Sequence, residues 1–171
     1  MSFIELSKNR FSTRKFLATP VEEDKILKIL ESAQNAPSAK NLQPHFVYVI
    51  KSKEALEKAN KATPCMYGAP LAFLVCVDMN KVWKSPSEPG LDSADIDGTI
   101  VATHITLEAT DLGLGSVIVR MFNIEETKKI FDLPENFKPI LFIPVGYTDP
   151  NFKPSINHDS RKPLDETSKV I

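Results

Sequence analysis

The sequence contains few of the residues from which disulfide frameworks and metal sites are built. Its 171 residues include two cysteines, Cys65 and Cys76, and three histidines. The cysteines form no Cys-x-x-Cys pair, and the histidines lie far apart in the chain, so no zinc-type ligand spacing is present. We therefore expect two reduced thiols and no metal site.

Long apolar runs and an excess of one charge are also missing. Residues 1–9 lack the apolar core of a signal peptide, and no run approaches the roughly 18 apolar residues of a membrane span. Lysine and arginine number 21 against 22 aspartates and glutamates, so the chain offers no broad positive field to a nucleic-acid backbone. These absences predict a cytoplasmic protein that binds neither nucleic acid nor a membrane.

The composition that remains is typical of one folded domain. Apolar residues make up 42% of the chain and charged residues 25%, and a chain of this length can bury a sizeable core. We expect a single domain over residues 1–171. The patterns predict strands at 45–50, 71–78, 116–119 and 139–147, and helices at 20–34, 53–61, 93–112 and from 123 onward.

Two of these helices carry further signals. Thr19 and Glu22 have the spacing of a capping box, and Pro20 suits the first helical position. The 93–112 helix has apolar residues on more than one face. That distribution favours a position in the centre of the domain or at a subunit interface.

Two segments have irregular composition. Residues 80–89 contain Trp83 among prolines, serines and lysines, so this segment is either a surface loop with its tryptophan against the core or a cover over a substrate. Residues 148–171 contain three prolines and little helical periodicity. We expect this tail to run in an extended form over the surface.

A short basic segment precedes the first long helix. Arg10, Ser12 and Arg14 place two guanidinium groups and a hydroxyl close together. Arginine offers a rigid fork of donors that matches phosphate oxygens. Alone, the segment indicates either a phosphate site or a solvated basic stretch.

A second polar segment lies between a helix and a strand. Ser38, Asn41 and Gln43 offer donors and acceptors that suit the edge of a planar heterocycle, on a loop bounded by prolines. The same composition also occurs in ordinary helix-to-strand connections. No histidine and aspartate accompany Ser38 at a spacing known for a serine nucleophile.

Glycines mark a third segment, where a helix ends and a strand begins. Gly113 and Gly115 allow close approach of the backbone to a ligand. They follow a helix instead of opening one, and Ile118 stands where a dinucleotide fingerprint has its third glycine. A Rossmann-type site is therefore excluded.

Taken together, these segments resemble the FMN-dependent nitroreductase family, over nearly the whole chain. The motifs occur in the family's order: Arg10-x-Ser12-x-Arg14, Ala36-Pro-Ser-x-x-Asn41-x-Gln43-Pro44, Leu112-Gly-Leu-Gly-Ser116, Ile143-Pro-Val-Gly-Tyr147 and Arg161. The resemblance implies an α+β fold with a mixed, mostly antiparallel sheet flanked by helices. It also implies an intertwined homodimer with FMN at the interface.

The resemblance further implies which residues contact FMN. Those at the phosphate would be Arg10, Ser12, Arg14 and Arg161. Those at the ring system, from the partner subunit, would be Pro37, Ser38, Ala39 and Asn41. The backbone of Ile118, Val119 and Arg120 would face flavin N5, and no side chain is expected to be catalytic.

The activity implied by the resemblance is transfer of a hydride from NADH or NADPH to the flavin and then to a small acceptor such as a nitroaromatic or a quinone. Two other functions stay open: a flavin-binding sensor or carrier without turnover, and a reductive dehalogenase or enoate reductase of the same fold. The chain differs from many relatives at His45, where they have tryptophan, and at Arg120 and Met121, where some have Glu-Gly. His45 is either a residue that begins a strand or a weak acid near the pocket.

Overall fold

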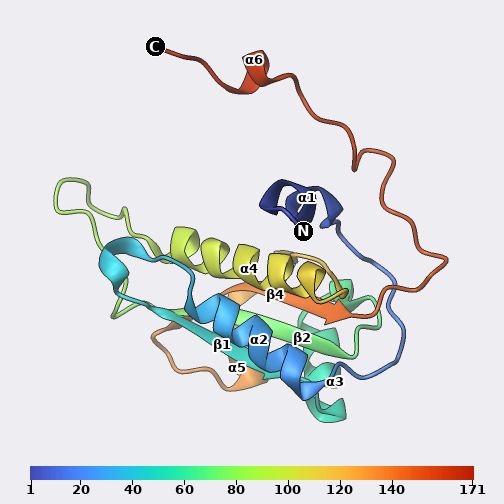
Figure 1. Ribbon diagram of the computed structural model, residues 1–171. Coiled ribbons are helices and arrows are strands. Elements are labelled where there is room, and N and C mark those ends of the chain that lie inside the picture. Colours follow the sequence, from blue (N-terminus) through green and yellow to red (C-terminus); the bar gives the residue numbers. More distant parts are fainter.

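The computed structural model describes residues 1–171 and contains one four-stranded sheet with the strand order β1-β2-β4-β3 (Figure 1). The strands are β1 (His45–Ile50), β2 (Leu71–Asp78), β3 (Gly115–Ser116) and β4 (Phe137–Gly146). All pairings between these strands are antiparallel, and the one parallel pairing is an isolated bridge between Ser12 and Ser116. The expected α+β fold with a mostly antiparallel sheet is confirmed, and its parallel part is limited to that bridge.

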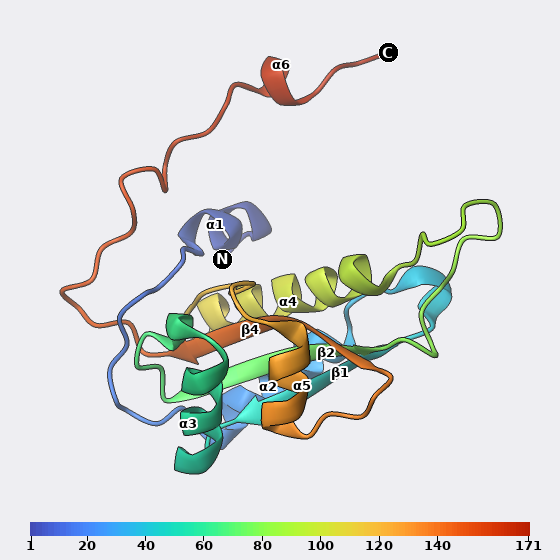
Figure 2. The ribbon, with the colours of Figure 1, turned by 180° about the vertical axis from the view of Figure 1, so that it is seen from behind.

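Helices cover both faces of this sheet. They are α1 (Phe3–Asn9), α2 (Glu23–Gln34), α3 (Lys53–Ala62), α4 (Ala94–Asp111), α5 (Ile124–Phe131) and α6 (Leu164–Thr167), with 3-10 turns at Ala39–Asn41 and Pro64–Met66. Helices α2 and α4 lie on one face, and α3 and α5 lie on the other (Figures 1 and 2).

Strand β2 is buried along its whole length because both of its faces are covered. Alternate side chains of a strand point to opposite faces. Phe73 and Val75 pack in the core beneath α2 and α4, whereas Leu74 and Cys76 pack in the core on the other side. A strand covered on both sides has a continuous apolar sequence, which is why 71–78 was recognisable. Burial also raises the pKa of the Cys76 thiol to about 12.

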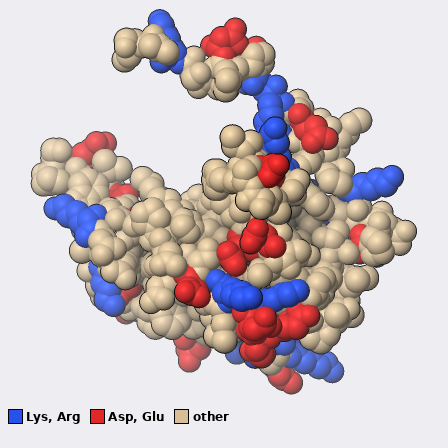
Figure 3. Space-filling model, viewed as in Figure 1, with Lys and Arg blue, Asp and Glu red and all other residues tan.

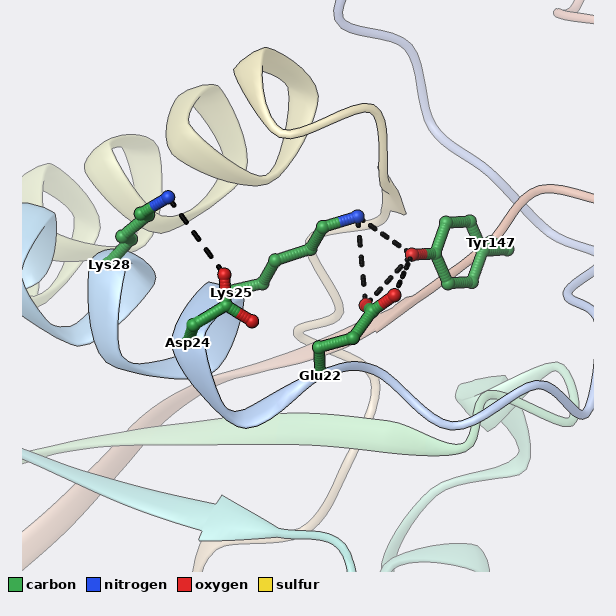
Figure 4. A network of polar contacts seen from close by, with 5 residues as sticks. All are labelled: Glu22, Asp24, Lys25, Lys28 and Tyr147. Carbon is green, nitrogen blue, oxygen red and sulfur yellow. Dashed lines mark hydrogen bonds and ion pairs between the residues drawn. The ribbon is translucent and has the colours of Figure 1, made fainter.

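Helix α2 begins three residues later than the capping-box pattern predicts, so that prediction was wrong at its start. Glu22 occupies the N-cap position, and its side chain caps no backbone N–H. Instead, the Tyr147 hydroxyl donates to the Glu22 carboxylate at 2.8 Å, and Lys25 Nζ donates to that hydroxyl at 2.7 Å (Figure 4). Val21 is buried in the core. These contacts hold the residues after Thr19 in an extended form and tie the start of α2 to the end of β4.

The predicted strand at 116–119 is shorter than expected. Only Gly115 and Ser116 pair regularly with β4, and Val119 pairs again as an isolated bridge with Phe142. The residue of β4 that accepts from Val117 N–H is Pro144. Proline has no N–H with which to return a hydrogen bond, so the ladder is interrupted between the two pairings.

The predicted long helix is confirmed as α4, with Ser93 at its N-cap position. Val101 and Ile105 are buried against the sheet, whereas Ile96 on another face is 60% exposed. The helix predicted from residue 123 is α5, and the Asn123 side chain accepts from Glu126 N–H at 2.9 Å. In this single chain, α4 therefore leaves apolar surface uncovered.

The two irregular segments project from the sheet and its helices (Figure 1). Residues 80–92, here called the 80–92 loop, form a narrow excursion closed by a bridge between Lys84 and Asp92. The tail follows the surface as far as His158, whose ring nitrogen contacts Lys8 O at 3.0 Å. From residue 159 onward every residue is exposed, and the chain extends away from the body.

Charges of both signs are distributed over the surface. On the face shown in Figure 3, basic and acidic side chains lie side by side, without one broad patch of either sign. None of the helices combines the length and apolarity that a bilayer span requires.

Candidate functional site

The basic segment forms one wall of a small pocket. Arg10, Ser12 and Arg14 line a cavity of about 170 Å³, whose other wall is formed by the tail residues Ser155, Asn157 and His158. Arg10 ends α1, and its N–H donates to Leu6 O at 3.1 Å. The following residues run beside β3, where Thr13 N–H donates to Ser116 O at 2.9 Å. Local structure thus places two guanidinium groups and a hydroxyl around one space.

The two arginines of this pocket have no anionic partner within the chain. Neither Arg10 nor Arg14 takes part in a salt bridge, although the chain forms several between lysines and carboxylates. Two guanidinium groups without a carboxylate partner, beside a hydroxyl, form a donor set suited to a phosphate. The chemistry of the pocket therefore fits a small dianion.

Arg161, the fourth residue expected at the phosphate, lies outside this pocket. Its side chain folds back onto the tail, where Nη1 donates to the carbonyl oxygens of His158 and Ser160. The tail leaves the body at this point, so nothing in the single chain holds the guanidinium against Arg10 and Arg14. Its role at the phosphate stays a prediction.

The 37–43 loop lines a second and larger space. Pro37, Ser38 and Ala39 face a cavity of about 410 Å³ at the start of α4, here called the α4 cavity. The rest of its lining comes from the 80–92 loop and the first turns of α4, and comprises Trp83, Leu91, Asp92, Ser93, Ile96, Asp97 and Ile100. Asn41 is exposed and does not line it. The cavity is largely apolar and could accept a planar ring.

The basic pocket and the α4 cavity lie toward opposite ends of α4. The basic segment is bonded to Ser116, just beyond the C-terminal end of the helix, and Ala39 N–H is bonded to Asp97, in its first turn. An α-helix rises about 1.5 Å per residue, so the two anchoring points are separated by about 20 Å along α4. One chain therefore does not bring the two expected halves of the FMN site together.

The backbone at residues 118–120 offers two free donors. Val119 N–H donates to Phe142 O at 2.9 Å, so it is already occupied. The N–H groups of Ile118 and Arg120 form no hydrogen bond within the chain. The Arg120 guanidinium lies 4.9 Å from the centre of the Phe122 ring. If this segment faces a ligand, Ile118 or Arg120 is the donor.

His45 begins β1 and pairs with Val77, as one of its two interpretations expects. Its Nδ1 atom is buried without a hydrogen-bond partner, and it does not line the α4 cavity. Burial lowers the pKa of His45, and the negative charge of Asp97 opposes this shift only in part. The imidazole is therefore neutral at pH 7.

Sequence reasoning missed Asp97, the carboxylate that bonds to Ala39. It is 1% exposed, although it belongs to the first turn of a helix. Acidic residues are common in first turns because they complement the helix dipole, and exposed Asp95 in the same turn has the same local pattern. The only available signal was an aspartate in a largely apolar helix, which does not reveal its partner. Elsewhere, no three histidine, cysteine or acidic side chains are arranged to hold a metal ion.

Comparisons with known proteins identify the family and the fold. The chain matches the model of the Nitroreductase family over residues 7–65 and 57–147. A nitroreductase family protein from Clostridium difficile 630 has 41% identical residues and a TM-score of 0.91, with 99% of this chain and 98% of that one covered. The FMN-dependent nitroreductase from Clostridium difficile R20291 is 27% identical, with a TM-score of 0.79 over 99% and 98% of the two chains.

A relative from Methanothermobacter thermautotrophicus has the provisional name NADH dehydrogenase/NAD(P)H nitroreductase. It is 34% identical over 162 residues, which cover 88% of this chain and 80% of that protein. Family model, relative and solved structures therefore agree on both the fold and the class of oxidoreductase. The chain belongs to the nitroreductase family.

Proposed function

We propose that the protein is an FMN-dependent NAD(P)H oxidoreductase that reduces a small acceptor such as a nitroaromatic or a quinone. The observation that carries the proposal is the pocket of Arg10, Ser12 and Arg14, where two guanidinium groups lack an anionic partner. The name of the Clostridium difficile R20291 structure, which describes an FMN-dependent enzyme, supports the choice of cofactor. Residues 1–171 would act as one domain, with a cytoplasmic location as the sequence predicts.

In this proposal the basic pocket holds the FMN phosphate. Arg10 and Arg14 would each donate charge-assisted hydrogen bonds to it, and the Ser12 hydroxyl would add a third donor. Arg161 lies only three residues beyond His158, which already lines the pocket. A small change in the path of the tail would bring its guanidinium to the same anion.

The ring system would lie between two subunits. Pro37, Ser38, Ala39 and Asn41 would approach it from the partner chain. A free N–H at Arg120 or Ile118 would stabilise negative charge at the reduced ring. When bound, FMN would supply the chemistry itself, by accepting a hydride at N5 and passing electrons to the acceptor. The protein's part is to hold the ring, leave one face open and exclude water.

A homodimer follows from the same proposal. One chain holds the two halves of the site about 20 Å apart along α4, so a second chain has to complete each site. The apolar surface that α4 leaves uncovered, including Ile96, and the extended tail would be covered in this assembly. Sedimentation should show a dimer at micromolar concentration, whereas a folded monomer saturated with FMN would contradict the shared site.

The absorption spectrum of the purified protein tests cofactor and activity together. Bound flavin should give visible absorption, which NADH or NADPH added without oxygen should bleach within seconds and a quinone should restore. Separate titrations with the two nucleotides give the donor preference. An acceptor panel with nitroaromatics, quinones, enoates and halogenated phenols separates this activity from other reductions on the same fold. Flavin that binds but is not bleached would indicate a sensor or carrier.

A further inference from the structure

The 37–43 loop has an unusual backbone for a segment without glycine. Lys40, Asn41 and Gln43 have φ values of 51°, 55° and 49°, and they are three of the five non-glycine residues with positive φ in the chain. Left-handed backbone is costly for a residue that carries a Cβ. Such residues persist where the surroundings hold them, and they gather at ligand sites.

Hydrogen bonds within the loop account for part of this conformation. The Ser38 hydroxyl accepts from Gln43 N–H at 2.9 Å, and Ser38 O accepts from Asn41 N–H at 2.9 Å. Only one hydrogen bond joins residues 37–43 to another part of the chain. It runs from Ala39 N–H to Asp97 Oδ1, over 3.0 Å. The Asp97 carboxylate is therefore the one hydrogen-bonded connection between the loop and α4.

Burying the carboxylate of Asp97 costs desolvation free energy, which an exposed carboxylate would not incur. Its side chain is buried and forms no salt bridge. A buried carboxylate has to be satisfied by hydrogen bonds. Its second oxygen, Oδ2, accepts from the Ser93 hydroxyl at 2.6 Å. Asp95, in the same turn, is exposed and pairs with Lys138 at 2.9 Å without touching the loop.

The same carboxylate is linked to the other wall of the α4 cavity. Ser93 Oγ, which donates to Asp97, also accepts from Trp83 N–H at 3.2 Å. Ser93 N–H donates to Trp83 O at 3.0 Å. A continuous set of hydrogen bonds therefore runs from the 80–92 loop through Ser93 and Asp97 to Ala39. These hydrogen bonds fix the positions of the two cavity-lining loops relative to each other.

We propose that Asp97 is a positioning residue, whose carboxylate holds the 37–43 loop in the conformation with which this loop contacts the flavin ring. The inference rests on the proposed FMN site. Asp97 itself touches Ala39 and Ser93 and acts through the backbone of the loop. Without the carboxylate, the residues with positive φ should leave their left-handed conformation, and the 37–43 loop should no longer form an ordered wall of the α4 cavity. The basic pocket at the far end of α4 should keep its structure.

Trypsin tests the loop without any flavin. Lys40 is exposed in the strained segment, so cleavage after it reports opening of the loop in the full-length apoprotein. Loss of a hydrogen bond to a charged group predicts cleavage about ten- to a hundredfold faster in Asp97→Ala. Asp97→Asn keeps an acceptor oxygen, so its cleavage rate should stay closer to that of the wild type. The control variant Asp95→Asn should be cleaved at the wild-type rate. Cleavage after Lys129, in α5, corrects for global unfolding.

Flavin binding tests the consequence for the site. Asp97→Ala should weaken FMN and riboflavin by the same factor, of about tenfold or more, because the loop would contact the ring and not the phosphate. The visible circular dichroism of the bound flavin should change, because it reports the surroundings of the ring. Asp97→Asn should recover most of both signals. A residue needed only for stability would lower the unfolding midpoint and leave the dichroism of the flavin that binds unchanged.

The outcomes separate this inference from the proposed function. If wild-type protein binds FMN and Asp97→Ala matches it in cleavage after Lys40 and in the dichroism, Asp97 does not position the loop. If wild-type protein binds no flavin, the proposed function and the flavin contact of the loop both fail. The cleavage assay then decides by itself whether Asp97 holds the loop.

Discussion

Replacing Gly115 with alanine would test how the basic segment is held against the sheet. A Cβ at this position would lie 2.3 Å from Thr148 Oγ1, 2.5 Å from Thr13 Oγ1 and 2.9 Å from Thr13 Cβ. These separations are too short for real contacts, and Thr13 is fully buried. The backbone at Gly115 or at Thr13 therefore has to move. A shift of Thr13 carries Ser12 and Arg14 with it.

The expected cost is that of overpacking a well-filled site, about 1–3 kcal/mol of unfolding free energy. For a chain of this length, each kcal/mol lowers Tm by about 2–4 °C. FMN binding should weaken as well, because Ser12 and Arg14 lie beside Thr13. Thr148→Ala in the same chain removes the closest atom and should recover part of the loss, giving a coupling of about 0.5 kcal/mol or more in a double-mutant cycle.

Urea unfolding of the apoprotein gives the free energy, and flavin fluorescence gives the FMN affinity. The four proteins of the cycle are wild type, Gly115→Ala, Thr148→Ala and the double variant. The packing argument would be refuted if the free energy of unfolding of Gly115→Ala lay within about 0.5 kcal/mol of the wild-type value, which is the usual range for a neutral surface change. Additive effects in the cycle would mean that Thr148 Oγ1 does not clash with the added Cβ.

Three further predictions concern the site and the thiols. Arg14→Ala should weaken FMN by about ten- to a hundredfold but leave riboflavin, which lacks the phosphate, unchanged in a fluorescence titration; equal losses for both would remove Arg14 from the phosphate. Arg120→Pro should slow flavin reduction by about ten- to a thousandfold in stopped-flow measurements, whereas Arg120→Ala keeps the N–H and most of the rate. A proline variant that binds FMN, stays dimeric and reduces normally would point to Ile118. At pH 8 a thiol reagent should label partly exposed Cys65 but not Cys76, because Cys76 is buried and its pKa is raised to about 12; rapid labelling of both thiols in the folded protein would contradict this burial.

Local sequence patterns predicted most of the secondary structure because their signals are short-range. Strand β2 was recognisable from its continuous apolar run, and α4 from a long apolar segment that ends at Gly113. The predictions were wrong where a distant partner changed a local preference. The Tyr147 hydroxyl donates to the carboxylate of Glu22, which was expected to close a capping box with Thr19, and Pro144 interrupts the pairing of the 116–119 segment.

The sequence by itself determined the chemistry of the candidate site. Arg10, Ser12 and Arg14 lie within five residues of chain, so their proximity follows from local geometry, although the opposite wall of their pocket comes from the tail. The proline-bounded loop after α2 was likewise visible as a polar segment. In both cases the residues that act together are neighbours in the chain.

Only the tertiary structure decided how these parts are placed. Ala39 and Asp97 are 58 residues apart, and their hydrogen bond exists because α2 and α4 pack side by side on one face of the sheet. The pairing of Val119 with Phe142 similarly occupies one of the three backbone donors and leaves Ile118 and Arg120 free. The separation of the two half-sites along α4 has the same origin. Periodicity specifies which residues are buried, but packing of distant segments specifies which of them meet.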